Sequence, residues 1–252
     1  MGSSGKRIYE RGATEMKIAV TSLIHGEGTT TVATSLAVML AETGERVTYI
    51  DCNTDKSKGR VLLKPEIQTN EPLTVPGPNS RVSGKLIHGR AWGIDFHGFT
   101  LDGKKNCSRT EICRKLSKFA GNWPIVFDLP AGSIYTKDHC CCNPDIIVVV
   151  ATPESLESER NISQLNRYLY TGPKLAILIN KNKDRNSYKK SRMNRVDIVG
   201  NVLFDVRIEE ADRNQMLALE LIPEIRPLFG SIMRKITQMA GSIQSRQIPV
   251  SR

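Results

Sequence analysis

The chain has 252 residues, of which 39% are hydrophobic and 6% aromatic, and its formal net charge is +10. Its length suits one α/β domain of ordinary size, and no apolar run approaches the roughly 18 residues that a membrane-spanning helix needs. The N-terminus lacks the apolar segment of a secretory signal, so we expect a cytoplasmic protein. The positive charge favours anionic partners such as nucleic acid, acidic lipid or nucleotide.

The two ends of the chain are set apart from the expected domain. Residues 1–15 begin with Met-Gly-Ser-Ser-Gly and are interpreted as an expression scar or a short leader, and residues 247–252 as a tail. We expect residues 16–246 to form a single domain.

The first half of the domain predicts a strand, a helix and a second strand. Residues 17–22 (Lys-Ile-Ala-Val-Thr-Ser) have the composition of a buried strand, and residues 30–43 carry apolar residues at helical spacing. A second strand is expected at 46–50. Residues 53–92 are rich in Pro, Gly, Asn and Lys and show little periodicity, so we expect an irregular insertion or the remnant of one.

The second half alternates strands with helices. We expect strands at 93–100, 124–127, 146–151, 174–179 and 198–204, and helices at 108–119, 155–168, 209–219 and 227–243. Ser108 and Glu111 predict a capping box at the start of the first of these helices. This alternation predicts an α/β fold with a parallel doubly wound sheet and helices on both faces, in which ligands sit at the carboxyl ends of the strands.

The segment between the first strand and the first helix predicts a phosphate-binding loop. Its sequence is His25-Gly26-Glu27-Gly28-Thr29-Thr30-Thr31. A strand, a glycine-rich turn and a helix form the context in which backbone N–H groups and a helix N-terminus hold phosphates. A working P-loop ends in Gly-Lys-Ser/Thr, but here Thr29 occupies the lysine position, which predicts weak or absent catalysis.

Polar residues at strand ends complete the predicted site. Asp51, Asp128 and Asn180 each follow an expected strand. Thr30 and Asp128 are placed to hold Mg²⁺, the first through its hydroxyl and the second through water. We expect Asp51 to position the attacking water or touch the metal, and Asn180 to hydrogen-bond an adenine edge. The predicted nucleotide-binding residues are Gly26, Glu27, Gly28, Thr29, Thr30, Thr31 and Asn180, with ATP or ADP and Mg²⁺ as the cofactors.

These motifs resemble those of the MinD/ParA group of deviant P-loop ATPases. The matching segments are Lys17–Thr31, Tyr49–Asp51, Phe127–Gly132, Val149–Glu154 and Leu178–Lys181. A closer similarity, through Tyr49–Asn53 and Leu62–Ile67, is to MinD-superfamily ATPases that carry an inserted ferredoxin domain. Residues 70–92 contain no cysteine, so the cluster-binding insert is expected to be absent. The resemblance implies a P-loop NTPase fold over most of residues 16–243.

The chain departs from this family in the phosphate loop. The family has two lysines and a further glycine where this chain has Ile24, Thr29 and His25. In the family the first lysine reaches the phosphates of the other subunit in a nucleotide-sandwich dimer, and the second grips the β- and γ-phosphates. The resemblance therefore predicts a nucleotide-binding or nucleotide-degenerate scaffold, a pseudo-ATPase that acts through a protein partner or as a homo- or heterodimer.

Besides a DNA-binding positioning factor that would use the basic loop 181–195, two other functions stay open at this point. One is an active ATPase whose missing cation comes from Lys56, Lys58 or another chain. The other is an accessory protein in iron–sulfur or metallocluster assembly, suggested by the closer family resemblance and by the run Cys140, Cys141 and Cys142.

The cysteines do not form a recognisable metal motif. The chain has six cysteines and no Cys-x-x-Cys pair, so neither a zinc ribbon nor a ferredoxin motif is present. We interpret Cys140–Cys142 as small buried hydrophobic residues, with a cluster shared with another chain as the alternative. An iron–sulfur cluster is therefore not the expected cofactor.

Two further segments suggest surfaces. Seven Lys or Arg residues and one acid lie between Lys181 and Arg195, which we interpret as a solvated loop, with a nucleic-acid contact as the alternative. Apolar residues recur at helical spacing from Leu228 to Ile243. We expect this last helix to pack on the sheet, and a membrane-surface role is the alternative that we do not favour.

Overall fold

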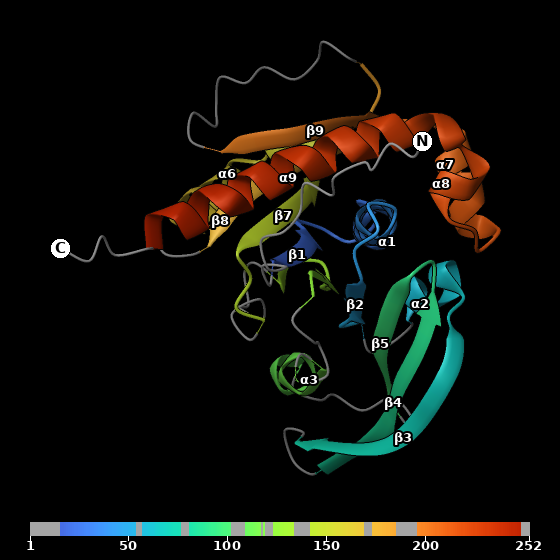
Figure 1. Ribbon diagram of the computed structural model, residues 1–252. Helices are drawn as coiled ribbons and strands as arrows, with labels where there is room; N and C mark the ends of the chain where they lie inside the picture. Colours follow the sequence, from blue (N-terminus) through green and yellow to red (C-terminus); the bar gives the residue numbers. More distant parts are fainter. Residues whose placement is uncertain are drawn as a thin grey trace, which may run out of the picture.

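The computed structural model describes residues 16–53, 57–76, 81–101, 109–116, 118, 123–133, 142–168, 173–184 and 196–247. Within these residues, a nine-stranded sheet has the order β3-β4-β5-β2-β6-β1-β7-β8-β9 (Figure 1). The strands are β1 (Lys17–Ser22), β2 (Val47–Asp51), β3 (Glu66–Pro76), β4 (Arg81–Ala91), β5 (Ile94–Leu101), β6 (Ile125–Asp128), β7 (Ile146–Ala151), β8 (Lys174–Asn182) and β9 (Asp197–Leu203).

The sheet is parallel except at one edge. In the order of the sheet, all neighbouring strands from β5 through β2, β6, β1, β7 and β8 to β9 pair in parallel. Strand β4 is antiparallel to both β3 and β5. The central strands β1 and β7 are almost completely buried; the continuous apolar composition of β7 predicts this, whereas β1 also buries Thr21 and Ser22. Parallel pairing brings the carboxyl ends of β1, β2, β6 and β8 to the same edge of the sheet.

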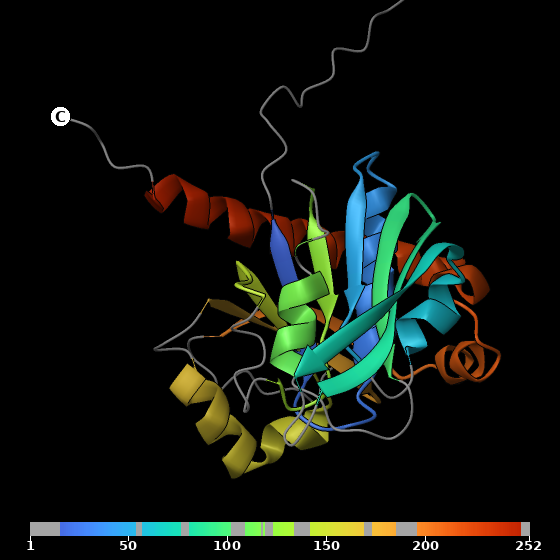
Figure 2. The same cartoon turned by 90° about the horizontal axis from the view of Figure 1, so that it is seen from below.

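Helices cover both faces of the sheet, so the predicted α/β class is confirmed. They are α1 (Thr29–Ala41), α2 (Lys58–Leu63), α3 (Arg109–Leu116), α5 (Pro153–Glu157), α6 (Glu159–Tyr168), α7 (Val206–Arg213), α8 (Ala218–Leu221) and α9 (Arg226–Gln247), with a 3₁₀ turn at Pro223–Ile225. One apolar cluster joins α1, α8 and α9 to the sheet, and a second joins α3, α5 and α6 to the opposite face (Figure 2).

The expectation that residues 53–92 are irregular is wrong. This region contains α2 and the long antiparallel hairpin β3–β4, which extends the sheet beyond β5 (Figure 1). Most of the described side chains of β3 are exposed, so the strand lacks the apolar alternation that normally marks a strand. In the sequence, Gly84 argues against a strand. In the structure a Cβ at this position would lie 2.3 Å from the Thr100 carbonyl oxygen, so the close packing of β4 on β5 requires glycine.

Two expected helices are each divided. The helix expected at 155–168 is interrupted at Ser158, whose extended backbone separates α5 from α6. The helix expected at 209–219 is replaced by α7 and α8, and Gln215 between them has a φ of 55°. The helix expected at 108–119 is observed as α3, but Ser108 of its predicted capping box lies outside the described residues.

The last helix packs on the sheet as predicted. Its apolar stripe, including Phe229, Ile232 and Ile236, is buried in the cluster that also contains α1. Among the described residues, no helix is both long and apolar enough to span a bilayer.

Candidate functional site

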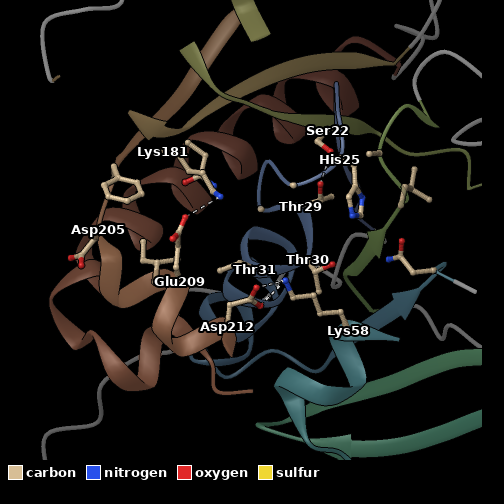
Figure 3. Close-up of a pocket in the computed structure, with 18 of the residues that line it drawn as sticks. Ser22, His25, Thr29, Thr30, Thr31, Lys58, Lys181, Asp205, Glu209 and Asp212 are labelled. Carbon is tan, nitrogen blue, oxygen red and sulfur yellow. Dashed lines mark hydrogen bonds and ion pairs between the residues drawn. The ribbon is translucent and has the colours of Figure 1, made fainter. Parts of the chain in front are cut away.

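A cleft of about 490 Å³ opens at the carboxyl ends of the strands, within the size range of small-molecule sites. Six residues of the predicted nucleotide-binding set line it: Gly26, Gly28, Thr29, Thr30, Thr31 and Asn180. The other walls come from Asn53 and Lys58, from Leu129 and Ala131 after β6, and from the segment that joins β9 to α7 (Figure 3). The structure thus brings together segments from both halves of the chain.

The N-terminus of α1 faces this cleft without a side-chain cap. Gly28 occupies the N-cap position with a φ of 93°, a conformation that favours glycine. The first N–H groups of an α-helix have no partner within the helix, so those of the first turn of α1 remain available to an anion. The loop therefore retains the backbone features of a phosphate site.

Thr29 does not project a charge into the cleft in place of the missing lysine. Its hydroxyl donates a hydrogen bond to Ser22 Oγ over 2.7 Å, and Ser22 Oγ in turn donates to the Ile24 carbonyl oxygen over 2.9 Å. The side chain is thus tied to the end of β1. The loop contributes backbone N–H groups and hydroxyls but no cation from this position.

Glu27 is buried and stabilises the loop from within. Only 1% of it is exposed. Its Oε2 accepts hydrogen bonds from the backbone N–H groups of Leu23 and Ile24, both over 2.9 Å, and its Oε1 accepts one from Thr152 N–H over 3.0 Å. Glu27 is not among the residues that line the cleft, so its predicted direct contact with nucleotide stays a prediction.

Asn180 lies against the phosphate loop. Its side-chain amide donates to the Glu27 carbonyl oxygen over 2.7 Å. A Cβ on Gly28 would lie 2.5 Å from Asn180 Nδ2, so this contact requires glycine. Asn180 also lines the cleft, and its predicted contact with adenine remains a prediction.

Asp128 carries an unsatisfied oxygen beneath the cleft. The residue is completely buried, Oδ2 accepts a hydrogen bond from the Tyr49 hydroxyl over 2.9 Å, and Oδ1 has no partner among the described residues. Burial, and then the nearby charge of Asp51, raise the pKa of Asp128 to about 8, against the opposite effect of Thr30 and Tyr49.

A metal-bound water would satisfy the Asp128 oxygen. Magnesium prefers oxygen ligands and keeps several waters, and the Thr30 side chain lies beside the same carboxylate. The residues present therefore fit the predicted magnesium site.

Asp51 is fully engaged with its own loop. Its Oδ1 accepts hydrogen bonds from both N–H groups of Asn53, the backbone one over 2.9 Å and the side-chain one over 3.0 Å. Its Oδ2 accepts from Ser57 Oγ over 2.7 Å and from Gly59 N–H over 3.1 Å. Burial nevertheless raises the pKa of Asp51. These bonds favour a structural role over the predicted positioning of water, which stays a prediction.

The acids at the start of and within α7 form a part of the site that sequence reasoning missed, whereas Lys58 is among the cations expected there. Asp205, Glu209 and Asp212 are spaced to lie on one face of a helix, and all three line the cleft. Lys58 Nζ lies 2.6 Å from the Asp212 carboxylate, and Lys181 Nζ lies 3.4 Å from Glu209 Oε1 (Figure 3). The helical spacing of the acids is the signal that could have revealed this wall.

Several predicted residues lie outside the described part of the chain. These are Lys56, Cys140, Cys141 and most of the basic loop 181–195. Cys142 is described and is buried. Within the described ranges, no three His, Cys, Asp or Glu side chains are grouped as metal ligands.

Comparisons with known proteins agree with this geometry. Residues 18–236 match the CobQ/CobB/MinD/ParA nucleotide binding domain. No curated protein matches the sequence significantly.

Solved structures share the fold at low sequence identity. The septum site-determining protein MinD of Pyrococcus horikoshii OT3, complexed with Mg-ADP, has a TM-score of 0.63 and 15% identity over 90% of this chain and 98% of that chain. The cell division ATPase MinD of Pyrococcus furiosus has a TM-score of 0.64 and 14% identity over 90% and 100% of the two chains. The MinC:MinD cell division protein complex of Aquifex aeolicus has a TM-score of 0.58 and 18% identity over 94% of this chain and 98% of that chain.

Proposed function

Because the chain belongs to the CobQ/CobB/MinD/ParA nucleotide-binding family, we propose that it binds ATP or ADP with Mg²⁺ in the cleft at the N-terminus of α1. The observation that supports this most directly is the uncapped N-terminus of α1, which opens into a cleft of about 490 Å³. Thr30 and Asp128 would hold the magnesium, which neutralises phosphate charge when bound.

Hydrolysis by this protein is weak or absent. The position that carries a lysine in working P-loops is Thr29, and its hydroxyl is bound to Ser22. A charge-assisted hydrogen bond contributes about 1.5–3 kcal/mol, so losing one from the phosphates costs about 10-fold to 150-fold in stabilisation of the reacting state. Backbone N–H groups and a metal ion can bind the nucleotide, but without the lysine they stabilise the reacting phosphate less.

A protein partner is part of the proposal. Ile24, Phe204 and Val206 are large exposed hydrophobic residues, and they lie on or beside segments that line the cleft. Ile24 also occupies the position from which family members contact the other subunit of the dimer. We propose that a protein partner binds the surface formed by Ile24, Phe204 and Val206, and that nucleotide in the cleft changes the affinity for this partner.

Titration calorimetry with ATP and ADP, with and without Mg²⁺, tests the proposal. We expect micromolar binding that strengthens with Mg²⁺, together with phosphate release close to the uncatalysed background. Absence of binding to the folded chain under all four conditions would overturn the proposed nucleotide site. Size-exclusion chromatography with and without ATP then tests whether occupancy changes self-association.

An active ATPase is a second candidate, favoured by the presence of Lys58 in the cleft. Steady hydrolysis that is lost in an Asp128→Ala variant would establish this function and exclude the scaffold without hydrolysis.

A further inference from the structure

Lys58 lies where a phosphate-binding cation is needed. It is the first residue of α2 and lines the same cleft as Thr30 and Thr31. Figure 3 shows its side chain extending from α2 to meet Asp212 beside the N-terminus of α1. The amine lies 2.6 Å from the Asp212 carboxylate, and both residues line the cleft together with the phosphate loop.

The backbone next to Lys58 is anchored to the buried part of the site. Gly59 N–H donates to Asp51 Oδ2, and a Cβ on Gly59 would lie 2.5 Å from the Tyr49 hydroxyl oxygen. Tyr49 in turn donates to Asp128. The start of α2 is thus hydrogen-bonded to the same buried residues that support the proposed metal position. The backbone of Lys58 is therefore held in place beside the cleft.

The present partner of Lys58 can be replaced at low cost. The side chains of Lys58 and Asp212 are 43% and 35% exposed, and an ion pair between side chains this exposed is weak. A nucleotide at the N-terminus of α1 would place several negative charges beside the same amine, and hydrogen bonds from lysine to phosphate are charge-assisted. The Asp212 carboxylate would meanwhile repel those phosphates.

We propose that Lys58 is the phosphate-binding cation of this cleft and that Asp212 competes with nucleotide for it. In the nucleotide-free protein, Asp212 neutralises the lysine; when nucleotide binds, the lysine exchanges the carboxylate for a phosphate. The inference rests on the proposed function. It adds that the cation missing at Thr29 comes from α2 and that an acid of α7 lowers affinity.

The first test removes the lysine charge. Lys58→Gln is compared with Arg60→Gln, which removes the same charge from an exposed position of α2 that does not line the cleft. We expect Lys58→Gln to weaken binding of Mg-ATP about 10-fold by calorimetry and Arg60→Gln to change it less than about twofold. Thermal midpoints without nucleotide that stay within about 3 °C of the natural chain show that both variants are folded.

The second test removes the competing acid. Asp212→Asn is compared with Glu210→Gln, an exposed acid of the same helix that does not line the cleft. We expect Asp212→Asn to tighten binding of Mg-ATP about fivefold and Glu210→Gln to tighten it less than about twofold. In a Lys58→Gln background the gain from Asp212→Asn should fall, because the acid then has no lysine to hold.

The outcomes separate the inference from the proposed function. Binding by the natural chain that is unchanged in Lys58→Gln overturns the role of Lys58 and leaves the nucleotide site intact. Absence of binding by the natural chain with binding by Asp212→Asn supports the competition and corrects the proposed function. Absence of binding by the natural chain and by Asp212→Asn overturns both.

Discussion

Glu27 Oε1 accepts a hydrogen bond from Thr152 N–H over 3.0 Å and thereby ties the phosphate loop to the N-cap of α5. Thr152 follows β7, 125 positions further along the chain. The conformation of the loop thus depends on the strand beside it as well as on its own glycines. Glu27, which the sequence places among the predicted nucleotide-binding residues, is a structural support of the loop in the fold.

Removing this support should destabilise the protein. In Glu27→Ala, the backbone N–H groups of Leu23 and Ile24 lose their side-chain acceptor, and that of Thr152 keeps only Ser155 Oγ. We expect a loss of about 2–4 kcal/mol in the free energy of unfolding, because a buried donor without a partner costs about 1–3 kcal/mol and water can reach part of this loop. Urea denaturation measures it. The exposed Glu154 provides the control, and equal stability of Glu27→Ala and Glu154→Ala would show that the buried carboxylate contributes nothing.

Restoring a lysine to the loop should strengthen nucleotide binding. Thr29→Lys loses the hydrogen bond to Ser22 Oγ, about 1 kcal/mol, and places an amine at the N-terminus of α1. We expect Mg-ATP to bind about 10-fold to 100-fold more tightly by calorimetry. Thr43→Lys adds the same charge beyond the other end of α1 and should leave affinity within about twofold. A Thr29→Lys variant that is folded and binds no better would mean that geometry, rather than charge, limits this loop.

Replacing Asp128 should separate stability from metal binding. Its Oδ1 is buried without a partner among the described residues, and Asp51 carries a second buried carboxylate on the neighbouring strand. We expect Asp128→Asn to raise the thermal midpoint of the nucleotide-free protein by several degrees, because the Asp128 carboxyl, with its raised pKa, must take up a proton to be buried at neutral pH and the amide does not. The same change should abolish the effect of Mg²⁺ on nucleotide affinity. A lower midpoint, or an undiminished Mg²⁺ effect, would contradict the role of Asp128 given above.

The histidine pair of the hairpin predicts a loss of stability in acid. His88 Nδ1 and His97 Nδ1 lie 2.5 Å apart on β4 and β5. Burial, and then the charge of His88, lower the pKa of His97 to about 4. An unfolded histidine titrates near pH 6.5, so the folded protein resists protonation: the stabilisation is complete above about pH 6.5 and is lost as the pH falls towards 4.

Urea midpoints measured between pH 7.5 and 4.5 test this dependence. The buried Asp128, whose pKa is raised to about 8, gives the opposite dependence in this range and is common to both proteins. We therefore expect the slope of stability against pH to be less positive in His97→Gln than in the natural chain. His25→Gln, at an exposed histidine of the phosphate loop, should keep the natural slope. If the urea midpoints of the natural chain and of His97→Gln change with pH in parallel, His97 is not the source of the loss of stability in acid.

The sequence itself determined the fold class and the position of the candidate site. Apolar strands such as residues 146–151 are visible as continuous runs, and the glycines before α1 mark the phosphate loop, because both signals depend on residues close together in the chain. Asp51 and Asp128 stand at strand ends, so parallel pairing alone brings them to the edge of the sheet beneath the cleft, although neither lines it. The exposed strand β3 carries no such local signal and was missed.

Only the tertiary structure decided what these side chains contact. Lys58 and Asp212 are 154 positions apart, and their ion pair exists because α2 and α7 are packed around the same strand ends. In the same way Glu27 turns inward because Thr152, directly after β7, supplies a backbone N–H, and Asp51 binds its own loop because Gly59 approaches it closely. Hydrogen bonds and ion pairs depend on atomic distances across the fold, and spacing along the chain does not encode those distances.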